Sequence, residues 1–79
     1  DLNRAAQHLS QAFNEARWHS TNTTFYADLL VVLNRINEAR EILRWLIAVI
    51  PEELAPERIQ ETIEDQEDAR RILERIGTR

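Results

Sequence analysis

The chain has 79 residues, of which 43% are hydrophobic and 30% charged, and its formal net charge is −4. These values are typical of one small globular domain and are too apolar for a disordered chain. The absence of cysteine excludes disulfides and thiolate sites, and the longest apolar run, at 45–50, is far shorter than the roughly 18 residues that span a bilayer.

The first predicted element is a helix over residues 1–19. Its apolar residues recur every three or four positions, which places them on one helix face. Asp1 is a candidate N-cap for this helix. Serine, threonine and asparagine then fill positions 20–24, where their side chains compete with helical backbone bonding, and we expect a connecting loop there. The expected core positions of this helix are Leu2, Ala5, Ala6, Leu9, Ala12, Phe13 and Ala16.

A second, longer helix is predicted over residues 25–50, because this stretch contains neither glycine nor proline and Pro51 ends it. Residues 51–56 form a tight connection with room for one helical turn. The expected buried face of the second helix consists of Phe25, Leu29, Val32, Leu33, Ile36, Leu43, Leu46, Ile47 and Ile50.

The third predicted helix covers residues 56–76 and stops at Gly77. Its inner face consists of Ile59, Ile63, Ala69, Leu73 and Ile76, but Gln66 interrupts this apolar stripe. Asp65 or Asp68 could instead cap a fresh helix and split the segment in two.

Short connections make sequential helices antiparallel neighbours, so we predict an all-α fold, a three-helix antiparallel up-down-up bundle that forms a single domain over residues 1–79. Pairing the second and third helices head to tail places Ile47 near Ile59. It also puts Arg40 beside Gln66 and Glu67, and a polar crossing of this kind would fix the register.

No arrangement of residues supports catalysis or a bound cofactor. His8 and His19 are eleven positions apart on different sides of a helix, whereas helix-borne metal ligands need spacings of three or four. Neither serine has an activating histidine and carboxylate, and there is no glycine-rich phosphate loop. We therefore predict that the chain is not an enzyme and binds no metal or cofactor.

The distribution of charge along the chain argues against nucleic acid and membrane partners. Residues 52–68 contain eight carboxylates and one arginine, and the other arginines are scattered, so no concentrated basic face is available for nucleic acid or an anionic membrane. We expect neither partner, and no targeting signal assigns a location. The glycosylation sequon at 22–24 is expected to be a chance match.

Two surface patches are not explained by the predicted packing. On the outer side of the first helix, Trp18 lies among amide side chains that include Gln11 and Asn14, although it could instead shield the following loop. On the second helix, a further apolar stripe lies opposite the core face and is flanked by Arg35 and Glu38. This stripe consists of Val31, Ile42, Trp45 and Val49.

Helix lengths leave the second patch partly uncovered. At 1.5 Å per residue the first helix spans about 28 Å and the second about 39 Å, so the last two turns of the second helix lack one neighbour. Exposed apolar side chains grouped around a tryptophan are typical of protein-binding sites. The sequence therefore predicts a non-enzymatic module that binds a protein partner through this face. Homodimerisation through the same patch, and a helix that covers it as ordinary core, remain alternatives.

Two resemblances add to this prediction. The absence of lysine and methionine and the single glycine make the chain similar to engineered or computationally designed helical bundles, which implies either a built binding face or a fold without a ligand. Residues 28–37, Asp-Leu-Leu-Val-Val-Leu-Asn-Arg-Ile-Asn, resemble the first helix of short-chain four-helix cytokines of the interleukin-2 type. That resemblance implies a receptor-contacting role for Asp28, with Val31 beside it.

Overall fold

The computed structural model describes residues 1–77, and these residues form helices and connecting turns only. The all-α prediction is confirmed, whereas the predicted count of three helices is wrong. Positions 78–79 of the predicted domain lie outside the described residues. The helices are α1 (Leu2–Glu15), α2 (Ser20–Val32), α3 (Ile36–Ala48), the single turn α4 (Pro51–Leu54) and α5 (Ile59–Ile76).

The predicted helix over 25–50 is two helices, because the chain reverses at Asn34. Asn34 has a φ of 61°, a left-handed conformation that asparagine tolerates better than most residues. The Asn34 amide donates to the Val31 carbonyl at 3.0 Å, and the Arg35 amide donates to the Leu30 carbonyl at 2.8 Å. This pair of bonds is the Schellman arrangement that closes a helix C-terminus. Asn34 is therefore a helix stop, and α3 folds back along α2.

The predicted loop at 20–24 is also wrong, because it forms the beginning of α2, while α1 ends at Glu15 rather than at His19. The hydroxyls of Ser20 and Thr21 donate to the Asp65 carboxylate of α5, at 2.5 and 3.0 Å. The His19 Nδ1 accepts the Asn22 amide at 3.4 Å and caps the new helix. Ser20 and Thr21 therefore make tertiary hydrogen bonds, and His19 caps the helix, so this polar segment is helical rather than a loop.

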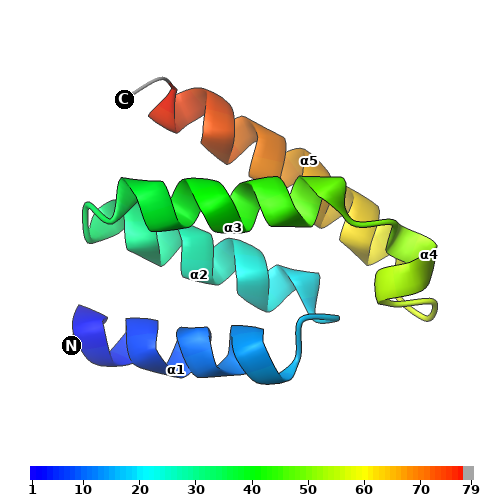
Figure 1. The fold of residues 1–79 in the computed structure, drawn as a ribbon, viewed down its shortest axis with the longest axis horizontal. Helices are drawn as coiled ribbons and strands as arrows, with labels where there is room; N and C mark the ends of the chain where they lie inside the picture. The colour runs from blue at the N-terminus through cyan, green and yellow to red at the C-terminus, as the bar shows by residue number, and fades with distance from the viewer. Residues whose placement is uncertain (78–79) are drawn as a thin grey trace.

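Sequential long helices run antiparallel, as Figure 1 shows. Helices α2, α3 and α5 all pack against one another, whereas α1 approaches only α2 at backbone distance among the described helices. The Cα trace measures 32 × 27 × 14 Å, so the molecule is flat. In the view of Figure 1, α3 crosses in front of α2, and α1 and α5 lie on either side of α2.

Two groups of buried side chains form the core. One, between α2, α3 and α5, includes Ala27, Leu43 and Ile72, and the other, between α1, α2 and α3, includes Phe13 and Leu30. Among the side chains expected in the core, Leu2 and Ile50 are about half exposed instead. Both lie next to helix ends, where fewer neighbours are available.

Helix α5 is unbroken, so the alternative with a split at Asp65 or Asp68 is wrong. Gln66 is buried, and its Nε2 donates to the carbonyls of Leu46 and Val49 at 3.1 and 2.9 Å. The predicted pairing of Arg40 with Gln66 is wrong, because Arg40 donates to the Gly77 carbonyl at 3.3 Å. Gln66, which interrupts the apolar stripe of α5, therefore caps the C-terminal end of α3.

Candidate protein-binding surface

The predicted stripe around Trp45 lies at the junction of the two core groups. Val31, Ile42 and Trp45 are partly buried and pack against both groups. The Trp45 ring meets the Phe13 ring edge-on, with 5.3 Å between centroids. The expectation that this stripe lacks a neighbour is therefore wrong, because the fold-back at Asn34 supplies one and α1 supplies another.

A cation covers the same aromatic pair. The Arg17 guanidinium carbon lies 4.6 Å from the Phe13 ring centroid and 5.5 Å from that of Trp45. Distances of this size are typical of cation–π contacts. Val49, at the end of α3, is also partly buried, and its carbonyl is occupied by Gln66. Trp45 and Val49 are therefore structural neighbours of the core rather than free side chains.

Arg35 and Glu38 form an exposed bidentate ion pair at the start of α3. The Arg35 Nε and Nη2 donate to the two carboxylate oxygens of Glu38 at 3.1 and 2.6 Å. The hydrogen bond from Arg35 lowers the pKa of Glu38, and the same bond raises the pKa of Arg35. This pair fixes the first turn of α3, which has no side-chain N-cap bond.

Three predicted site residues meet in one shallow groove. Gln11 and Asn14 of α1 line it together with Arg35 and the buried Tyr26, and its volume is about 380 Å³. Gln11 also donates to Glu15 at 3.1 Å, within its own helix. Most of the residues that line this groove have polar side chains, and none is a large aliphatic residue.

Trp18 lines a different hollow from Gln11 and Asn14. It is 51% exposed, and its ring lies 5.4 Å from that of His19. It borders a hollow of about 410 Å³ against the α4 connection, formed by Leu54, Ala55, Pro56, Glu57 and Arg58. The predicted site residues are thus distributed over the core junction, a polar groove and this hollow.

The most exposed large apolar side chains lie elsewhere, on the outer side of α2. Phe25 is 57% exposed and Val32 is 68% exposed, although both were predicted to be core. The opposite side of α2 is buried, with Ala27 and Leu30 fully inaccessible. Phe25 and Val32 are seven residues apart and therefore share one side of the helix. We call Phe25, Asp28 and Val32 the α2 face.

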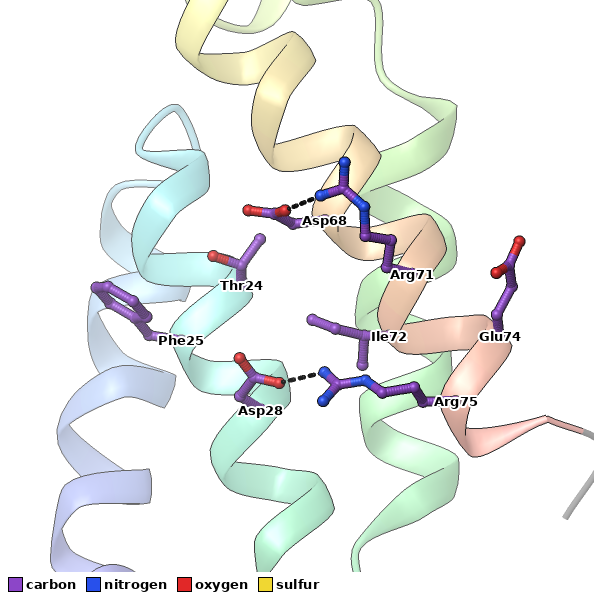
Figure 2. A pocket seen from close by; sticks show the side chains of 8 residues that line it. All are labelled: Thr24, Phe25, Asp28, Asp68, Arg71, Ile72, Glu74 and Arg75. Carbon is purple, nitrogen blue, oxygen red and sulfur yellow. Dashed lines mark hydrogen bonds and ion pairs between the residues drawn. The ribbon is translucent and has the colours of Figure 1, made fainter.

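A groove between α2 and α5 borders the α2 face (Figure 2). Its volume is about 610 Å³, and Ile72 contributes a buried apolar side chain to it. Arg75 of α5 reaches across to Asp28 of α2, with 3.5 Å between Nη2 and Oδ1. A second hollow of about 450 Å³ is also lined by Asp28, Ile72 and Arg75 and extends to Val32.

A second ion pair lines the groove on α5 alone. The Arg71 Nη1 lies 2.6 Å from the Asp68 Oδ1, as Figure 2 shows. Both side chains are more than half exposed. The groove therefore combines the apolar side chains of Phe25 and Ile72 with the two ion pairs and a third carboxylate, that of Glu74. Its two arginines are both paired, so it lacks the unpaired cations that an anionic ligand would need.

The prediction of one helix over residues 25–50 hid this surface. Asparagine is a recognised C-terminal stop, so Asn34 was a signal for the helix end in the sequence. Apolar side chains occur on every side of α2, however, so the periodicity of this helix does not distinguish the buried Ala27 and Leu30 from the exposed Phe25 and Val32.

Among residues 1–77, no group of three histidine, aspartate or glutamate side chains could hold a metal ion. Within that same range, no helix is both long and apolar enough to cross a membrane. No family model matches the sequence, and neither the curated proteins nor the solved structures contain a match to it.

Proposed function

We propose that the chain is a non-enzymatic protein-binding module that presents the α2 face to a protein partner. The observation that carries the proposal is the exposure of Phe25 and Val32 on one side of a helix whose other side is fully built into the core. Two large apolar side chains in water cost free energy that a partner could recover by burying them.

The geometry suits recognition by an extended surface rather than capture of a small molecule. Positions i and i+7 on a helix are the anchor spacing of helix-mediated recognition, and the adjoining groove is open. Asp28 lies between the two anchors, at the position to which the cytokine resemblance assigns receptor contact. The α2 face replaces the Trp45 stripe in this proposal, because the Trp45 stripe is already occupied by packing within the chain.

The proposal is tested with a photo-crosslinking residue, p-benzoylphenylalanine, placed at position 25. Ile50 is the matched control, because it is apolar, 52% exposed and outside the α2 face. We expect covalent protein adducts, identified by mass spectrometry, from position 25 and not from position 50. Adducts at neither position, or equally at both, would show that the α2 face has no specific protein partner and would favour a designed bundle without a ligand.

A further inference from the structure

We infer that α1 is exchanged between two copies of this chain, so that α1 of each copy packs on α2 and α3 of the other. The buried site under α1 is formed by Tyr26, Leu30, Ala39 and Trp45, and we call these four residues the α1 seat. The α1 seat shares no residue with the α2 face. The exchange is therefore independent of the proposed function.

The helix that fits the α1 seat is visible in the structure, because α1 itself occupies it. The Phe13 ring of α1 is 9% exposed, and its centroid lies 6.1 Å from that of Tyr26 and 5.3 Å from that of Trp45. Ala6 is also buried, and Leu9 packs against the same group. These three positions of α1 have the i, i+3 and i+7 spacing of one helix face. A second copy carries the same helix, so its α1 is complementary to the seat.

Apolar and ring contacts alone hold α1 against the other helices. Within residues 1–77, no hydrogen bond or ion pair joins α1 to another helix, and its side-chain bonds stay within α1 and its N-cap. By contrast, Ser20 and Asp65 join α2 to α5, and Gln66 joins α5 to α3. Few contacts are therefore broken when α1 leaves, and α1 of a second copy restores all of them.

The linker between α1 and α2, residues 16–19, has the properties of a hinge. It contains neither glycine nor proline, so it can continue a helix as well as reverse the chain. The reversal is held locally, because the His19 amide donates to the Ala16 carbonyl at 3.0 Å and the His19 Nδ1 accepts the Asn22 amide at 3.4 Å. In the exchanged form the linker straightens, and helical bonds to the preceding turn replace these two contacts. Short linkers of this kind favour exchange of a terminal element.

Concentration decides which form is present. The closed monomer and the exchanged dimer contain the same α1 contacts, so the balance between them depends on the linker and on the effective concentration of α1 beside its own seat. For a short linker this effective concentration is in the millimolar range. We therefore expect closed monomers at micromolar concentration and exchanged dimers at about 1 mM and above.

The first experiment is sedimentation equilibrium of the full chain up to millimolar concentration. We expect a monomer–dimer equilibrium whose dissociation constant falls roughly tenfold in His19→Ala, because the exchanged dimer does without the two His19 caps that closed monomers need. Asp1→Ala is the matched control. It removes the cap at the far end of α1, where Asp1 accepts the Arg4 amide at 2.8 Å, and it should leave the dissociation constant unchanged.

Two outcomes of this experiment would overturn the exchange. If the wild-type chain and His19→Ala both remain monomeric at millimolar concentration, α1 does not leave its own seat. If Phe25→Glu weakens the dimer, the copies associate through the α2 face, whereas an exchanged dimer should not respond to this substitution.

A second experiment identifies the contacts between the copies. Chains with p-benzoylphenylalanine at position 13 are mixed with isotope-labelled wild-type chains at millimolar concentration and irradiated. We expect adducts between labelled and unlabelled chains, with mass spectra that place the link at Tyr26 or Trp45, the two rings beside Phe13. The same probe at position 8, which is exposed on α1, should give no link to the α1 seat. Adducts within single chains only, or links between chains outside the α1 seat, would overturn the exchange.

Discussion

Gln66 shows how one buried polar side chain can close a neighbouring helix. Its Nε2 donates to the carbonyls of Leu46 and Val49 at the C-terminal end of α3, where the last carbonyls lack partners from a following helical turn. The Leu46 carbonyl also accepts the Val49 amide, at 3.4 Å. We expect Gln66→Leu to lower the free energy of unfolding by about 1–3 kcal/mol, because the carbonyls of Leu46 and Val49 lose a buried donor. Urea denaturation followed by circular dichroism measures this loss.

The control for this substitution is Gln60→Leu on the same helix. Gln60 is exposed and bonds only to Glu64 at 3.4 Å, so its loss should change stability by less than about 0.5 kcal/mol. If Gln66→Leu were as stable as the wild type, the added apolar contact would outweigh the cap. The hydrogen bonds of Gln66 to α3 would then give no net stability over a leucine at this position.

The Arg35–Glu38 pair gives a pH dependence of stability. Hydrogen bonding to Arg35 lowers the pKa of Glu38 from its ordinary value of 4.5 in the folded state. The pair therefore stabilises the fold above pH 4.5, and this contribution is lost as the pH falls through the lowered folded pKa. We expect Glu38→Gln to be less stable than the wild type at pH 7 and equal to it in strong acid. Urea unfolding at the two pH values measures the difference, and a difference that persists in acid would show that charge is not its cause.

At the scale of elements, substitutions at Asn34 test whether residues 25–50 form two helices or one continuous helix. In the left-handed conformation glycine is unstrained and alanine costs roughly 1 kcal/mol or more, so stability should fall in the order Gly, Asn, Ala at this position. A continuous helix over 25–50 would give the opposite order, because alanine exceeds glycine by about 1 kcal/mol within a helix. The free energies of unfolding of Asn34→Gly, Asn34→Ala and the wild type, measured by urea denaturation, distinguish the two orders of stability.

The element boundaries show what a single sequence can predict. The predicted helix end before Gly77 is confirmed, and the end predicted at Ile50 lies close to the observed end of α3 at Ala48. Both ends are signalled locally, because proline and glycine restrict or free the backbone at their own positions. The beginning of α2 could not be placed, because Ser20 and Thr21 use their hydroxyls on Asp65, which is more than 40 positions away in the chain. Once the boundaries were wrong, the helix wheel assigned Phe25 to the core, and the candidate surface was lost with it.

The contact between α1 and α3 includes an aromatic pair, Phe13 and Trp45. Trp45 is partly buried against Phe13, so Trp45→Ala should lower the free energy of unfolding by about 2–4 kcal/mol. A double-mutant cycle with Phe13→Ala should give a coupling of about 0.5–1.5 kcal/mol. The half-exposed Trp18 is the control, since Trp18→Ala should cost much less. Equal small effects for both tryptophans would restore Trp45 as a free binding anchor.

At the scale of the whole molecule, the arrangement is a three-helix unit of α2, α3 and α5 with a fourth helix attached to one side. Each of these three helices packs directly on the other two, but α1 is held by α2 and by side chains that reach α3. Local opening requires less free energy where fewer contacts are broken. We therefore expect α1 to open before the other helices unfold.

Native-state hydrogen exchange measures this difference residue by residue. The amides of α1 should exchange with a lower free energy of opening than the central amides of α2, α3 and α5, which should exchange only through global unfolding. Phe13→Ala should widen the gap, because Phe13 is the buried ring that joins α1 to Trp45. Because Phe25 and Val32 lie on α2, the α2 face would stay folded while α1 opens. Equal protection in α1 and α5 would contradict the subdivision and would show that all four long helices unfold as one unit.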